Sequence, residues 1–111
     1  MRSSHAPRHL YVVLNNPGPN GEILFVNFTT RNLPRDAKEE VFTGSDYSRL
    51  THLSVIAFWG AHPNANAQGL EAAIRSGDFI TLPEIPLQTL ERMIAAARTS
   101  PHLSAAQKGL L

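Results

Sequence analysis

Two apolar segments flank a loop that can be neither helix nor strand, and this arrangement limits the possible folds most strongly. Residues 10–14 read Leu-Tyr-Val-Val-Leu, and residues 23–29 read Ile-Leu-Phe-Val-Asn-Phe-Thr. Such β-branched and aromatic runs favour strands. Between them, residues 15–21 hold two prolines and two glycines, which favour turns. The connection is too short for a parallel crossover, so we predict an antiparallel hairpin.

Other short apolar runs extend this β-rich pattern. We expect residues 10–14 to form a strand that is buried on both faces or central in its sheet, and residues 55–59, Val-Ile-Ala-Phe-Trp, to form a third core strand. Residues 40–43 and 79–82 predict two further short strands.

Helical periodicity appears later in the chain. Residues 69–76 predict a two-turn helix that ends at Gly77. A longer helix begins at Pro86, which is tolerated as a first helical residue, and Ser100-Pro101 predicts the cap of a last short helix. The longer helix has an apolar stripe made of Leu87, Leu90, Met93, Ile94 and Ala97.

This order, with strands first and helices last, predicts an α+β domain in which a small barrel or curled sheet is covered by a C-terminal helix. The 111 residues suit a single domain. We expect residues 1–8 to be a flexible N-terminus and residues 9–111 to be the domain.

Composition narrows the function classes. The net charge of +1 predicts no global field for nucleic acid or membrane, so such a partner would need a local patch. The absence of cysteine excludes disulfides and thiol nucleophiles. No apolar run approaches the roughly 18 residues of a membrane span, and we expect a cytoplasmic protein without a membrane partner.

Polar side chains gather where the predicted core strands begin and end. In an antiparallel hairpin the start of one strand lies beside the end of the next, so we expect His9 and Thr29 to be neighbours. Whether the third strand brings its own polar residues to this end depends on its direction. The candidates are Arg8 and His9, then Thr29, Thr30 and Arg31, and finally Thr51, His52 and Ser54.

These residue types suit chemistry at an RNA phosphodiester. Imidazoles such as those of His9 and His52 act as general acids and bases near neutral pH. Arginine neutralises phosphate and threonine hydrogen-bonds to it, and Arg49 is a further cation for this role. The alternative is that these side chains only cap strands and turns.

Other candidate sites are weaker. The histidine spacing does not favour a metal site, and we expect no metal or cofactor. Trp59 and Tyr47 could stack on bases, although for Trp59 we favour a core or interface position.

In this order of elements the chain resembles the MazF/PemK toxins of bacterial toxin-antitoxin systems. A basic residue opens a Val-rich strand, a long loop leads to a second strand ending in Thr29-Thr30, and a polar excursion, a third strand and a terminal helix follow. The resemblance implies an SH3-like antiparallel β-barrel that forms a homodimer, cleaves single-stranded RNA without metal and is blocked by an antitoxin.

The family's motifs can be carried over onto this chain by position. Its Arg-Pro falls on His9-Leu10 and its Pro-x-Thr-Ser on residues 27–30, which implies a phosphate-contacting role for Thr29. Its Asp-Gln falls on Trp59-Gly60, where no acid stands. Either His9 and His52 replace the missing groups, or the barrel is not catalytic.

Three hypotheses follow. In the first, a toxin-like endoribonuclease uses His9, Thr29 and His52 for catalysis, and Arg8, Thr30, Arg31 and Ser54 bind the substrate. The second is a non-catalytic SH3-like binding module for protein or nucleic acid, including a gyrase-inhibitor-like toxin. The third is an accessory scaffold that acts through its terminal helix.

Overall fold

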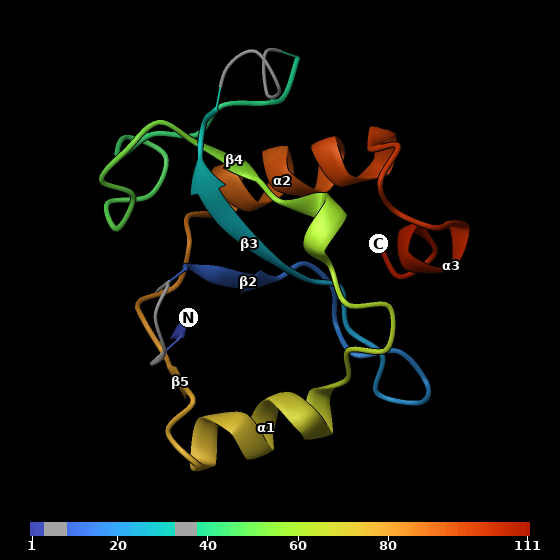
Figure 1. Cartoon of the computed structure of the whole chain (residues 1–111). Helices are drawn as coiled ribbons and strands as arrows, with labels where there is room; N and C mark the ends of the chain where they lie inside the picture. Colours follow the sequence, from blue (N-terminus) through green and yellow to red (C-terminus); the bar gives the residue numbers. More distant parts are fainter. Residues whose placement is uncertain (4–8, 33–37) are drawn as a thin grey trace.

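The chain folds into an α+β structure in which strands dominate the first half (Figure 1). A computed structural model describes residues 1–3, 9–32 and 38–111. In chain order the elements are β1 (Arg2–Ser3), β2 (Tyr11–Val13), β3 (Phe25–Thr30), β4 (Ser54–Ile56), the 3₁₀ helix η1 (Phe58–Gly60), α1 (Ala67–Arg75), β5 (Phe79–Ile80), α2 (Leu87–Thr99) and α3 (Ala105–Lys108).

The central strand is β3, which pairs antiparallel with both β2 and β4. The predicted hairpin between β2 and β3 is therefore confirmed, with Tyr11 opposite Asn27. The expectation that β2 is central or buried on both faces was wrong. It is an edge strand of the three-stranded sheet, and its residues are only half-buried. Its outer side meets the start of the chain, where the Tyr11 N–H donates to the Met1 carbonyl.

The hairpin loop is organised by Asn15. Its Oδ1 accepts from the Leu24 N–H at 2.6 Å, and its Nδ2 donates to the Glu22 carbonyl at 3.1 Å. These bonds replace a backbone–backbone hydrogen-bonded pair at the point where the two strands separate. Gly21 adopts a φ of 80°, a left-handed conformation that glycine accepts without steric cost.

The sheet does not close into a barrel within the described residues. The three-stranded sheet and the β1–β5 pair are joined by a single bridge between Arg2 and Leu10. At the opposite border, the predicted strand at residues 40–43 is reduced to one bridge between Phe42 and Ser54. The third core strand is also shorter than predicted, because the chain turns into η1 at Phe58.

The predicted helices are present, with changes at their ends. α1 begins two residues earlier than expected because the Asn66 side chain accepts from the Gly69 N–H and caps it. Gly77 follows α1 with a φ of 85°. The cap of α3 is Ser104 rather than Ser100, because Ser104 forms a reciprocal capping box with Gln107. Among the described helices, none combines the length and apolar composition needed to cross a membrane.

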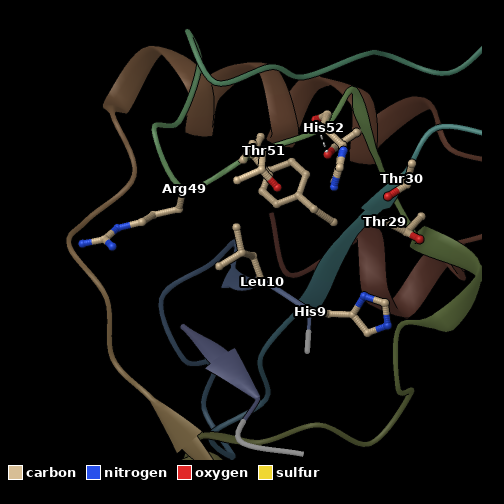
Figure 2. A pocket seen from close by; sticks show the side chains of 10 residues that line it. His9, Leu10, Thr29, Thr30, Arg49, Thr51 and His52 are labelled. Carbon is tan, nitrogen blue, oxygen red and sulfur yellow. Dashed lines mark hydrogen bonds between the residues drawn. The ribbon is translucent and has the colours of Figure 1, made fainter. Parts of the chain in front are cut away.

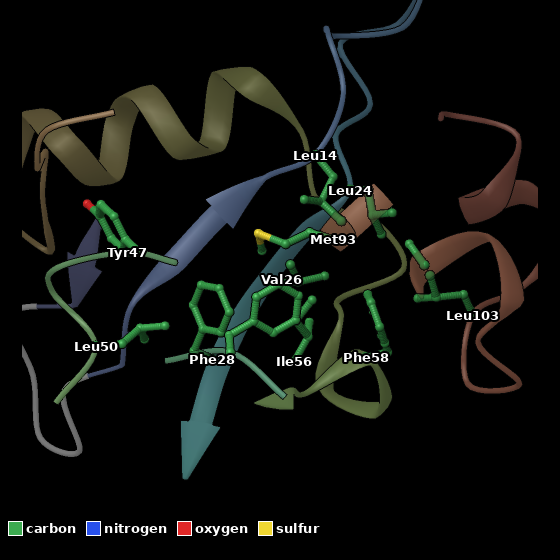
Figure 3. Close-up of a cluster of buried hydrophobic side chains, with 12 residues drawn as sticks. Leu14, Leu24, Val26, Phe28, Tyr47, Leu50, Ile56, Phe58, Met93 and Leu103 are labelled. Carbon is green, nitrogen blue, oxygen red and sulfur yellow. The ribbon is translucent and has the colours of Figure 1, made fainter. Parts of the chain in front are cut away.

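The core lies between the inward face of the sheet and α2 (Figure 3). In β3, Val26 and Phe28 are buried while the residues that alternate with them are more exposed, the pattern of a strand with one covered face. From α2, Met93 and Ala97 are fully buried, but Leu87 is 68% exposed and does not join the predicted stripe in the core. The cluster comprises Leu14, Leu24, Val26, Phe28, Phe42, Tyr47, Leu50, Ile56, Phe58, Met93, Ala97 and Leu103.

The position of α2 over the core predicts unequal effects of two truncations on this helix. We expect Met93→Ala to lower the free energy of unfolding by about 2–5 kcal/mol, because it leaves a cavity in the core. Leu87→Ala is the matched control and should change it by less than about 0.5 kcal/mol. Urea unfolding followed by circular dichroism measures both, and equal losses would contradict this packing of α2.

Tyr47 gives the fold a dependence on alkaline pH. Burial raises the pKa of the Tyr47 phenol, whose hydroxyl donates to the Pro83 carbonyl at 2.7 Å. Because the folded state holds this proton more tightly than the unfolded chain does, its contribution to stability is present below about pH 10 and lost as pH rises through the raised pKa. We expect Tyr47→Phe to weaken the decline of the melting temperature above about pH 10, measured by thermal unfolding across that range. An identical decline in both proteins would exclude Tyr47 as its source.

Candidate functional site

Polar residues from three strand ends converge on one pocket of about 230 Å³ (Figure 2). Five of the seven residues that the first hypothesis assigns to the site line it, namely His9, Thr29, Thr30, His52 and Ser54. Thr51 and Arg49, which the sequence also singled out, line it too, and the remaining lining residues are Leu10, Phe28 and Leu50. The sequence left open whether His52 reaches the hairpin end, and the structure brings it there.

The antiparallel register of β3 explains this convergence. On one side, the Phe28 N–H donates to the Leu10 carbonyl, so His9 arrives next to the end of β3. On the other side, Thr30 lies opposite Ser54. The end of β3 therefore meets the starts of both neighbouring strands.

Ser54 is a buried residue of the pocket lining that bonds to the backbone. It is only 5% exposed, and its hydroxyl donates to the His52 carbonyl at 2.9 Å. This bond holds the bend that precedes β4 and carries the His52 imidazole. Ser54 therefore lines the pocket, as predicted, and its hydroxyl is also bonded to the backbone of the protein.

The charged and titratable side chains of the pocket favour an anion. Its lining contains Arg49 and two histidines but no carboxylate among the described residues. Figure 2 shows the His9 ring below Thr29 and the His52 ring beside Thr30, while the Arg49 guanidinium extends away from them. Arg49 therefore stands at the rim of the site.

The floor of the pocket is apolar. Phe28 and Leu50 are buried members of the core, and Leu10 packs against it. Sequence patterning identified Phe28 and Leu10 as strand residues but gave no sign that they also form this floor. Leu50 precedes a predicted polar cluster in a loop, and only folding brings it under the site.

The two other arginines of the hypothesis are not part of the described lining. Arg31 follows β3, and its N–H donates to the Leu53 carbonyl at 2.8 Å, but its side chain does not line the pocket. Arg8 lies outside the described residues. Arg49 is the arginine that the structure brings to the pocket.

The candidate stacking residues lie elsewhere. Tyr47 is buried at 7% exposure, so its ring is a core residue and not a platform for bases. Trp59 is 43% exposed and makes an edge contact with His102 at 5.8 Å between ring centroids, so it is not a core residue. Within the described ranges, no three His, Asp or Glu side chains gather in a way that could hold a metal ion.

No protein-family model, curated protein or solved structure matches this chain. The geometry of the pocket is therefore the observation from which a function can be proposed.

The bond between Ser54 and His52 predicts a local cost when it is removed. We expect Ser54→Ala to lower the free energy of unfolding by about 1 kcal/mol, because the His52 carbonyl loses the hydroxyl that donates to it. Ser48→Ala, on an exposed residue of the preceding loop, is the control and should stay within about 0.5 kcal/mol of wild type. Urea unfolding tests this, and a neutral Ser54→Ala would indicate that the bond contributes nothing to the bend.

Proposed function

We propose that this protein is a metal-independent endoribonuclease that cleaves single-stranded RNA, as a divergent MazF/PemK-like toxin. The single observation that carries the proposal is the pocket that brings two imidazoles together with the Thr29-Thr30 pair. In this proposal the open, curved sheet is a variant of the SH3-like barrel. The proposed setting is the cytoplasm, with a homodimer as the active form and an antitoxin protein as the inhibitor.

The proposed reaction is an internal transesterification. One imidazole takes the proton of the ribose 2′-hydroxyl as its oxygen attacks phosphorus, and the other gives a proton to the departing 5′-oxygen. The products are a 2′,3′-cyclic phosphate and a free 5′-hydroxyl. His9 and His52 divide these two proton transfers between them.

The remaining polar groups suit the phosphate. Thr29 and Thr30 carry hydroxyl donors at the position where non-bridging oxygens gain charge, and such donors are worth most when they are aimed in advance. Arg49 adds a positive charge at the rim. Among the described residues, the lining carries no carboxylate that would repel the anionic substrate.

The proposal predicts a requirement for both histidines. We expect purified protein to cleave end-labelled single-stranded RNA in the presence of EDTA. His9→Ala and His52→Ala should each slow cleavage by about 10²–10⁴-fold, the usual contribution of a general acid or base.

Two controls make this test specific. His62→Ala removes an exposed imidazole outside the pocket and should cleave at the wild-type rate. A substrate with 2′-deoxyribose at the cleaved position should remain intact, because it lacks the attacking oxygen. Absence of cleavage by wild-type protein, or undiminished cleavage by the His9→Ala/His52→Ala double variant, would overturn the assignment.

A non-catalytic binding module is the second candidate. It is favoured by the pair Trp59-Gly60, which stands where the resembled family carries Asp-Gln, and by the absence of a carboxylate from the described lining. Under this alternative, RNA stays intact, the protein is harmless when expressed alone, and a stable complex with a protein or nucleic acid is recovered.

A further inference from the structure

One wall of the pocket comes from a segment without regular secondary structure. Residues 49–52 line the site, and they follow a series of turns that begins at Thr43. Within the described residues, backbone pairing ties the start of this segment to the sheet through the bridge between Phe42 and Ser54. Irregular segments are positioned by tertiary contacts. Contacts from an element outside the sheet must therefore fix the position of residues 49–52.

Arg92 of α2 supplies much of that support. Its Nε and Nη2 donate to the same Glu40 oxygen at 3.0 and 2.7 Å, and Nη1 donates to Asp46 Oδ1. Nη2 also donates to the Val41 carbonyl at 3.0 Å. The guanidinium carbon lies 4.6 Å from the centroid of the Phe42 ring. One side chain therefore contacts four residues between Glu40 and Asp46, which lead into the wall of the pocket.

Asp46 is held from two further directions. The Thr89 hydroxyl, one turn before Arg92 on α2, donates to the Asp46 carbonyl at 2.6 Å. The Asp46 Oδ2 accepts from the Thr43 N–H at 2.9 Å. Beyond it, the Leu50 N–H donates to the Tyr47 carbonyl, and this turn contains Arg49 and leads into the pocket wall.

We propose that Arg92 is a positioning residue, which with Thr89 fixes the turn at Asp46 and thereby sets where His52 and Arg49 stand in the pocket. The geometric part of this inference is independent of the reaction. Its effect on cleavage rests on the proposed endoribonuclease activity.

The chemistry of arginine explains why this position needs it. The planar guanidinium offers donors in several fixed directions, so it reaches two carboxylates and a carbonyl at once. A lysine ammonium has the same charge but cannot reproduce this fork. The Arg92 and Glu40 side chains are 39% and 48% exposed, and an ion pair this open adds little to global stability. The Asp46 side chain is 21% exposed, so the less exposed pair is the one that holds the turn. Loss of Arg92 should therefore lower the local order of the pocket wall more than it lowers the stability of the fold.

The decisive experiment compares Arg92→Met and Arg92→Lys with Arg98→Met. Arg98 is an exposed residue in the last turn of the same helix, so its variant controls for loss of charge on α2. The readout is the imidazole carbon–proton NMR spectrum of the full chain, with the His52 signal assigned through His52→Ala. We expect both Arg92 variants to shift or broaden the His52 signal and to leave the His62 signal in place, while Arg98→Met moves neither.

A kinetic arm adds a second readout. We expect Arg92→Met to lower kcat for RNA cleavage by about 10–100-fold, with a smaller change in KM, because misplacement of a reacting group acts mainly on the chemical step. Arg92→Lys should recover little of this loss, although it restores the charge. Thr89→Val keeps Arg92 and should cause a smaller shift of the His52 signal in the same direction.

The outcomes separate this inference from the proposed function. If wild-type protein fails to cleave RNA, the enzymatic proposal falls, and the NMR comparison still decides whether Arg92 positions His52. An unchanged His52 signal in folded Arg92→Met and Arg92→Lys would overturn the inference. If Arg92→Met does not fold, Arg92→Lys and Thr89→Val decide it.

Discussion

The pairing of β3 with a strand on each side is the constraint on which the rest of the structure depends. Thr30 lies opposite Ser54 on one side, and Tyr11 lies opposite Asn27 on the other. Both pairings are antiparallel, so the end of β3 meets the starts of its two neighbours. A shift of one residue in either register would turn the alternate side chains to the opposite face, exposing core residues and dispersing the pocket.

The same strand therefore serves the core and the site. Val26 and Phe28 enter the core beneath α2, and Phe28 also forms part of the pocket floor. Thr29 and Thr30 continue the chain into the polar mouth of the pocket. Because the floor is packed core, the polar groups above it stand on a rigid base, which is the condition for hydrogen-bond donors that are oriented before a substrate arrives.

The remaining wall of the pocket depends on α2, which is remote from it in sequence. Glu40 raises the pKa of Arg92 through a hydrogen bond to the guanidinium, consistent with a contact that favours the charged form. Through Arg92 and Thr89 the helix holds the segment that leads to His52. In this structure α2 covers the core with one face and supports the candidate site with polar side chains along its edge.

Local sequence determined the hairpin, the glycine-bounded end of α1 and the grouping of polar residues at strand ends, because each follows from turn chemistry or periodicity within a few residues. It failed where distant contacts decide. The strand expected at residues 55–59 gives way to a 3₁₀ turn, and the expected barrel stays open within the described residues. Of the two positions expected for Trp59, the core was wrong and the interface stays a prediction. Patterning also could not show that β4 would bring His52 to His9, or that Arg92 would hold the intervening loop. Those outcomes depend on strand direction and on side chains more than 40 residues apart, and only the assembled tertiary structure brings them together.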